Sequence, residues 1–237
     1  MGWLTLRSSS ATPIVQKWEP YLEIYDRHFR VLRARKYAPR ILQFGDGVGG
    51  DLAMWRWFFG PSARLYLVDP YNRTLDYSNN RSYGRPEHVF VGTATMPSLW
   101  REVRFQTGSS FDLIIHSSAA SPEQQIACVE HGLPLLVGGG LVLVEEVTGN
   151  QNRFIQYVQQ RYLWGGDATL FKPPTHPVMS MDPSSAQRIT MGVYFYTFMV
   201  VIEKRRYERV RLAVMPRTVV QTVSAGRVPR PRVVPRD

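Results

Sequence analysis

The sequence predicts an α/β fold with a doubly wound, mostly parallel, seven-stranded sheet, and three observations predict it. Short apolar runs alternate with amphipathic segments from residue 20 to about residue 162, an order typical of parallel sheets. A glycine-rich turn, GDGVGG, follows the first apolar run, and an acidic residue ends the second. A long β-rich run near residue 200 predicts an antiparallel hairpin at one edge.

The helices are predicted from apolar spacing and from residues that start or stop a helix. Pro20 suits a first turn, and apolar residues then recur at helical spacing. His28 lies on that apolar stripe, so we expect a core histidine with a partner rather than a ligand. Asp51 is predicted to cap the second helix, and Ser121 to open the fourth. The predicted helices are 20–32, 52–59, 97–103, 122–131 and 154–162.

The strands are predicted from short apolar runs bounded by turn residues. They cover residues 41–44, 65–68, 89–91, 112–115 and 141–144. The last of these follows three consecutive glycines, Gly138 to Gly140. The run VYFYTFMVVI, residues 193–202, is predicted as one long β segment with 209–214 as its hairpin partner. The polar stretches 71–88 and 165–189 are predicted to be connections.

Length and composition limit the class of protein. The 237 residues suffice for one domain with tails. We divide them into an N-terminal arm (1–19), a folded domain (20–206) and a basic, Pro/Arg-rich C-terminal extension (207–237). No apolar run reaches 18 residues, so a membrane span is not expected. The sole cysteine, Cys128, excludes an internal disulfide and a cysteine zinc cluster, and it fits an intracellular, reducing compartment.

The net charge of +10 is concentrated at the C-terminus. Residues 204–237 hold ten Lys or Arg against two acids, a net of +8. Such a segment favours RNA or an acidic protein surface as partner, and the alternative is a solvated tail. Because proline and valine separate its arginines, we expect an extended arm along phosphates or an acidic groove. The candidate contacts are Arg227, Arg230, Arg232 and Arg236.

The N-terminal residues carry a weak targeting signal. No acid precedes Glu19, while Arg7, Lys17 and three serines do. This composition resembles an organellar transit peptide, and the alternative is an ordinary arm. The expected compartments are therefore the mitochondrial matrix and the cytoplasm.

The glycine turn predicts a nucleotide-type cofactor pocket. Gly45, Gly47 and Gly50 match the dinucleotide pattern, because glycine lets the backbone approach a ligand closely. Asp69 follows Gly50 by 19 residues, at the end of a strand, where a carboxylate can accept ribose hydroxyls. Both NAD and S-adenosylmethionine fit this pattern. The alternative is a tight turn that binds nothing.

Four blocks of the chain carry a resemblance to a known family. They are ILQFGDGVGGDLAMWRWFFGPSARLYLVDP, VFVGTATMPSLWREV, FDLIIHSSAASPEQQIACVEHGLPLLVGGGLVLVEEV and VYFYTFMVVIEKRR. In order and spacing they resemble class I S-adenosylmethionine-dependent methyltransferases, most closely the group of macrolide-sugar O-methyltransferases and so-called cephalosporin hydroxylases. The resemblance implies that Gly45, Gly47 and Gly49 line the methionine end of S-adenosylmethionine, and that Asp69 holds the ribose.

The chain departs from this family at its acidic positions. Gln43 stands where the family usually has Glu, and Thr93 and Thr197 stand where it has Asp. The DDGSH sequence of the family, which serves metal binding and catalysis, reads HSSAA here, from His116 to Ala120. The acidic pair Glu145 and Glu146 is retained.

These departures predict a weakened catalytic site. We expect no bound metal, because a hard cation such as Mg²⁺ needs several oxygen ligands. The candidate catalytic residues are His116, Glu145 and Glu146, which are also weak candidates for a transition-metal site. His116 is the candidate base.

Three hypotheses follow from the sequence. The first is a catalytically degenerate methyltransferase fold that serves as a structural or accessory subunit of a larger assembly, including an organellar ribonucleoprotein. The second is an active S-adenosylmethionine-dependent O-methyltransferase acting on a small-molecule or sugar hydroxyl. The third, an NAD-type protein, rests on the glycine pattern alone.

Overall fold

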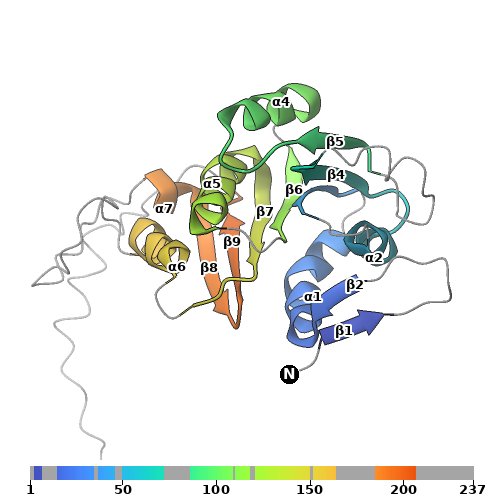
Figure 1. Ribbon diagram of the computed structural model, residues 1–237, viewed down its shortest axis with the longest axis horizontal. Coiled ribbons are helices and arrows are strands. Elements are labelled where there is room, and N and C mark those ends of the chain that lie inside the picture. Colours follow the sequence, from blue (N-terminus) through green and yellow to red (C-terminus); the bar gives the residue numbers. More distant parts are fainter. Residues whose placement is uncertain are drawn as a thin grey trace, which may run out of the picture.

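Seven strands form the central sheet of the computed structural model. The structure describes residues 3–6, 15–34, 37–45, 50–71, 86–108, 110–117, 121–149, 152–163 and 185–206. The strands are β3 (Arg40–Phe44), β4 (Arg64–Asp69), β5 (His88–Val91), β6 (Phe111–His116), β7 (Leu136–Glu145), β8 (Thr190–Tyr196) and β9 (Met199–Lys204). Their spatial order is β5-β4-β3-β6-β7-β9-β8, which Figure 1 shows as one twisted layer.

The sheet is doubly wound. From β3 the chain moves through β4 to β5 on one side, and then returns to place β6 and β7 on the other side, all in parallel. β9 inserts antiparallel between β7 and β8. The predicted fold class is confirmed. The order reverses between β3 and β6, and ligands of open α/β sheets bind beyond the carboxyl ends of the strands at such a point.

Helices cover both faces of the sheet because each presents an apolar stripe to it. α1 (Glu19–Arg33) and α2 (Gly50–Phe59) contribute to one buried cluster, which contains Phe29, Trp55 and Leu143. α4 (Pro97–Thr107), α5 (Pro122–Gly132) and α6 (Arg153–Val158) cover the other face. Two short turns, η2 (Leu133–Leu135) and the π-helical η3 (Gln159–Leu163), extend α5 and α6, and α7 (Ser185–Ile189) precedes β8. No described helix has both the length and the apolar character that a membrane span requires.

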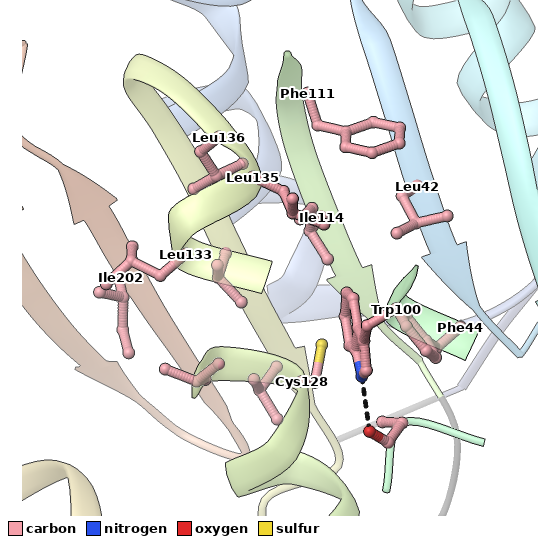
Figure 2. Close-up of a cluster of buried hydrophobic side chains, with 14 of the residues drawn as sticks. Leu42, Phe44, Trp100, Phe111, Ile114, Cys128, Leu133, Leu135, Leu136 and Ile202 are labelled. Carbon is pink, nitrogen blue, oxygen red and sulfur yellow. Dashed lines mark hydrogen bonds between the residues drawn. The ribbon is translucent and has the colours of Figure 1, made fainter. Parts of the chain in front are cut away.

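Figure 2 shows the cluster on the second face. Trp100 packs between Phe44 and Ile114, and its indole N–H donates a 2.7 Å hydrogen bond to the carbonyl of Ala94. The Cys128 thiol is fully buried in this cluster. Burial raises the pKa of this thiol, so it is a packing group rather than a reactive nucleophile.

The N-terminal residues form a hairpin rather than only an arm. β1 (Trp3–Leu6) pairs antiparallel with β2 (Val15–Trp18), and β2 runs directly into α1. Figure 1 shows this hairpin beside α1 and α2. Val15 and Lys17 are both buried. Since alternate residues of a strand share a face, β2 presents this pair to the domain.

Three local predictions need correction. Asp51 is not a cap, because α2 already begins at Gly50 and the Asp51 side chain turns to partners inside the fold. β7 begins at Leu136, so the three glycines lie inside the strand, where its pairing with β6 is irregular. The run 193–202 is not one strand. It turns at Thr197 and Phe198, so that β8 and β9 form the edge hairpin themselves.

The unexpected turn is held by tertiary contacts. Phe198 has φ of +61°, a conformation that a side chain like phenylalanine adopts rarely. Its carbonyl accepts hydrogen bonds from the Tyr21 hydroxyl and the Val147 amide, both at 3.0 Å. Its ring lies 5.6 Å from that of Trp18. These contacts hold a turn that contains neither glycine nor proline, which is why the sequence alone does not indicate it. The predicted partner strand 209–214 and most of the connection 165–189 lie outside the described residues.

A close backbone contact explains why residue 138, inside β7, is a glycine. A Cβ atom there would lie 2.6 Å from the carbonyl oxygen of Arg206. We expect Gly138→Ala to reduce the free energy of unfolding by about 1–3 kcal/mol, because backbone must move to relieve the overlap. Gly132→Ala is the matched control, since its nearest neighbour is a side-chain tip, the Ile114 Cδ1 atom at 3.2 Å. Urea unfolding of both variants measures the difference, and equal stabilities would contradict the explanation.

Candidate functional site at the carboxyl ends of the strands

A pocket of about 240 Å³ lies at the carboxyl ends of β3, β4, β5 and β6. This is the switch point of the sheet, where the fold predicts a ligand. The lining combines apolar groups with a few polar ones, as expected of a small-molecule site. The lining residues are Phe44, Gly45, Val68, Pro70, Tyr71, Gly92, Thr93, Ala94, His116, Ser117 and Gln124.

His116, the last residue of β6, contributes a buried imidazole to this pocket. The ring stacks on Phe44 with the centroids 5.6 Å apart, and it is 1% exposed. Burial lowers its pKa to about 4, so the imidazole is neutral at neutral pH. Its Nδ1 atom is buried without a hydrogen-bond partner among the described residues. As a base it is weak, because a general base works best with a pKa near the working pH.

Two of the predicted cofactor residues, Gly45 and Asp69, belong to the part of the chain that the structure describes, and both lie at this edge of the sheet. Gly45 directly follows β3 with φ of +74°, and its amide donates to the carbonyl of Val68. Asp69 ends β4, is 1% exposed and accepts a 2.7 Å hydrogen bond from the Tyr71 amide. Its neighbours Val68 and Pro70 line the pocket. Gly47 and Gly49 lie outside the described residues. The cofactor roles of all four remain predictions.

On the opposite face of the sheet, the same edge holds a buried ion-pair cluster around Lys17. The Lys17 ammonium lies 2.7 Å from Asp51 Oδ2 and 2.6 Å from Glu145 Oε2, and it donates to Ser117 Oγ at 2.7 Å. The Lys17 side chain is 4% exposed. Burial alone would lower its pKa, but the charges of Asp51 and Glu145 more than offset this, so the pKa is raised. The lysine is therefore charged inside the protein.

Two aromatic residues and a glutamine complete the hydrogen bonds of this cluster. The Tyr25 hydroxyl donates to Glu145 Oε1 in a short hydrogen bond. Gln43 donates from its amide nitrogen to Asp51 Oδ2 and to the Gly45 carbonyl, both at 2.7 Å. The amide oxygen of Gln43 in turn accepts from the Trp55 indole N–H. Gln43 thus donates from its amide nitrogen, which a glutamate carboxylate at this position could not do.

The structure does not bring the three predicted catalytic residues together. His116 pairs with Val144 across β6 and β7. Since side chains alternate along a strand, Glu145 lies on the opposite face from Val144 and His116. His116 accordingly packs on Phe44, whereas Glu145 contacts Lys17 and Tyr25. Among the described residues there is no group of three or more His, Cys, Asp or Glu arranged to hold a metal ion.

Glu146 lies next to this cluster in a strained conformation. It has φ of +57°, and its amide donates to the Tyr21 hydroxyl at 3.2 Å. Half-burial and the nearby charge of Glu145 raise the pKa of its carboxyl group. A non-glycine residue with positive φ is typical of functional sites and switch regions.

Sequence reasoning missed Lys17, Asp51 and Tyr25 as members of the site. The one available signal was the alternation of Val15 and Lys17, which puts Lys17 on the face that β2 buries. The charge partners had no signal, because Glu145 is 128 residues away. His28, by contrast, has the expected partner, since its Nε2 atom lies 2.7 Å from the Tyr196 hydroxyl.

Sheet order and edge geometry define a class of fold. Dinucleotide-binding Rossmann domains have the order 3-2-1-4-5-6. Here an antiparallel strand is inserted before the last position, giving 3-2-1-4-5-7-6 when the strands from β3 to β9 are numbered from one. The chain has the class I S-adenosylmethionine-dependent methyltransferase fold.

Among solved structures, those of the enzyme MycE have a fold similar to that of this chain. MycE methyltransferase from the mycinamycin biosynthetic pathway, in complex with Mg and SAH, matches with a TM-score of 0.59 and 19% identity over 87% of this chain and 55% of that one. The same enzyme with Mg, SAH and mycinamycin VI matches with a TM-score of 0.56 and 22% identity over 87% and 53% of the two chains. This chain thus spans about half the length of MycE. No family model and no curated protein sequence matches the chain.

The residues of the pocket fit half of the cofactor that this fold implies. The apolar walls and the unpaired Nδ1 atom of His116 suit a nucleoside such as the adenosine of S-adenosylmethionine. The other half of the cofactor carries an ammonium group. At the same edge, Asp51 and Glu145 already hold the ammonium group of Lys17, so these two carboxylates are not open to a second ammonium group.

Proposed function

We propose that this chain is a methyltransferase-fold protein without methyl-transfer activity, and that it serves as a structural or accessory subunit of a larger assembly. The observation that carries the proposal is the internal ion pairing of Asp51 and Glu145 with Lys17. Both carboxylates lie at the carboxyl edge, where they could otherwise position a cation or accept a proton, and an internal ammonium group neutralises half of their charge.

The chemistry of methyl transfer to a hydroxyl supports the same conclusion. The reaction needs the acceptor oxygen in line with the methyl group and a base for its proton. His116 is a weak base because burial lowers its pKa to about 4. Glu145 is buried, lies on the opposite sheet face and is bonded by Tyr25 and Lys17. His116 lines the pocket but is a weak base, and Glu145 is not placed to take up a proton from an acceptor there.

The partner is proposed from the basic C-terminal segment. Residues 204–237 carry a net charge of +8, with arginines separated by proline and valine. We propose that this segment contacts RNA or an acidic protein surface in the assembly, and an organellar ribonucleoprotein is the assembly that fits this charge. The segment has no tryptophan or phenylalanine and its one tyrosine is Tyr207, so phosphate contacts rather than base stacking would supply its affinity.

Substituting four arginines of the segment tests the partner. We expect Arg→Gln at positions 227, 230, 232 and 236 to release the protein from its assembly on a density gradient of cell extract. If the partner is single-stranded RNA, the slope of log affinity against log salt should also become shallower by about 0.7 for each phosphate that the variant no longer neutralises. The matched control makes the same substitution at four exposed arginines of the folded domain, which are Arg30, Arg64, Arg101 and Arg104.

Two outcomes of this experiment would contradict the proposal. The first is equal release by both quadruple variants, which would show a general effect of charge. The second is a wild-type protein that sediments as a monomer in extracts of its own cells.

A second candidate function is an active O-methyltransferase on a small-molecule or sugar hydroxyl. The pocket of about 240 Å³ at the switch point favours it. It predicts single-turnover transfer of the methyl group from labelled S-adenosylmethionine, abolished by His116→Ala or Glu145→Gln.

A further inference from the structure

Three oxygen atoms converge on one point inside the fold, and a lysine ammonium group fills that point. Asp51 Oδ2, Glu145 Oε2 and Ser117 Oγ lie 2.6–2.7 Å from Lys17 Nζ. An ammonium group has three N–H donors. The three oxygens therefore use its whole donor capacity, which makes this a complete site for a primary ammonium ion.

The three oxygens are held independently of Lys17. Gln43 donates to Asp51 Oδ2 at 2.7 Å, and Ser117 Oγ donates to the same oxygen at 3.2 Å. Tyr25 donates to the second oxygen of Glu145. Asp51 comes from the start of α2, Glu145 from the end of β7 and Ser117 from the residue after β6. These contacts would keep the oxygens in place without the lysine.

The cation reaches this site from a different part of the chain. Lys17 lies in β2, which is outside the seven-stranded sheet and packs against α1 and α2. Two carboxylates face one ammonium, so the removal of Lys17 would leave two negative charges in a buried position. Such charges are strongly unfavourable unless a cation compensates them.

We propose that the Lys17 ammonium is the resident cation of an oxygen-lined site formed by Asp51, Ser117 and Glu145. By carrying Lys17 into this site, β2 excludes free cations from this edge of the sheet. This inference shares the ion pairs with the proposed function, but it holds whether or not the protein transfers methyl groups.

The number of oxygens and their distances from the nitrogen favour one chemical class of cation for the vacated site. Oxygens 2.6–2.7 Å from the Lys17 nitrogen lie at the short end of charge-assisted N–H···O hydrogen bonds, which are about 2.7–2.9 Å long. Mg²⁺ requires about 2.0–2.1 Å and six ligands, and Ca²⁺ about 2.3–2.6 Å and six to eight. Three oxygens are fewer than either metal requires but equal the three N–H donors of an ammonium group, so a small primary alkylammonium ion fits better.

Chemical rescue of Lys17→Ala tests the proposal. The substitution removes three carbons and the ammonium group, which n-propylammonium replaces. We expect the thermal midpoint of the variant to fall by about 10 °C. We expect n-propylammonium chloride to restore it in a saturable manner, while tetramethylammonium chloride, which has no N–H donor, restores little. The wild type and Arg101→Ala, which removes an exposed cation, should respond equally little to both salts.

Three outcomes would overturn the proposal. Equal rescue by both salts would reduce the effect to screening. Rescue by millimolar MgCl₂ but not by n-propylammonium would make the site a metal site. A variant as stable as the wild type without any amine would show that the ammonium group is not needed.

A second variant keeps the test decisive if Lys17→Ala does not fold. The double variant Lys17→Ala, Asp51→Asn removes one carboxylate together with the ammonium, so one buried charge remains instead of two. We expect it to be more stable than Lys17→Ala and to bind n-propylammonium in a calorimetric titration. A double variant that is no more stable than the single one, or that gives no heat of amine binding, would contradict the inference. Methyl transfer is measured separately, so its presence or absence leaves these readouts unchanged.

Discussion

Lys17→Met is expected to lower the free energy of unfolding by about 3–5 kcal/mol, because it leaves Asp51 and Glu145 buried without their cation. Methionine keeps most of the side-chain volume, so the loss reports the charge rather than a cavity. Urea unfolding at pH 7 measures it. Arg101→Met, which removes an exposed cation, is the control and should change stability by less than about 0.5 kcal/mol.

A double-mutant cycle assigns this loss to the ion pair. In a Glu145→Gln background, Lys17→Met should cost less than in the wild type, because only one carboxylate is then left unpaired. An equal cost in both backgrounds would contradict a direct interaction between Lys17 and Glu145. It would make the lysine a packing residue of the β2 strand.

Acid should destabilise the protein through His116, by about 2 kcal/mol between pH 7 and pH 5. The folded-state pKa of about 4 lies below the ordinary value of 6.5. Between these two values the unfolded chain binds a proton that the folded chain does not, so stability falls as the pH falls through 6.5 and levels off below about 4.

Comparison with a variant isolates this contribution. His116→Phe removes the titrating group while it keeps an aromatic ring against Phe44. The difference in unfolding free energy between the wild type and this variant should change by about 2 kcal/mol over the same pH range. His131→Gln, at an exposed position of α5, is the control. If the wild type and His116→Phe lose stability in parallel, the imidazole is not held neutral by burial.

The fold can be predicted from the sequence because its signals are local. The GDGVGG turn, Asp69 at the end of β4 and the apolar run of β6 each lie within a few residues of the element that they define. Ser121 caps α5 as predicted, since its hydroxyl accepts from the Gln124 amide. The β-rich run indicates an edge hairpin near residue 200, but the turn at Thr197 and Phe198 depends on Tyr21 and Trp18, which lie far away in the sequence.

The candidate site can be predicted only in part, for the same reason. His116 has a local signal, because it ends the apolar run of β6. Its separation from Glu145 depends on which face of the sheet each side chain takes, and that follows from the register of β6 and β7. In the sequence alone, Lys17 is one charge of a basic arm. Its burial depends on the docking of β2 against α1 and α2, and the position of Asp51 beside it follows from that docking rather than from the sequence around Lys17.

Calorimetric titration of the full chain with S-adenosylmethionine and S-adenosylhomocysteine tests the central claim most directly. The claim is that the carboxyl edge keeps its pocket while Lys17 occupies the carboxylates, so neither compound should bind in the micromolar range. Micromolar binding, tighter for S-adenosylhomocysteine than for S-adenosylmethionine, would contradict this account. It would favour an active methyltransferase whose acceptor is still to be found.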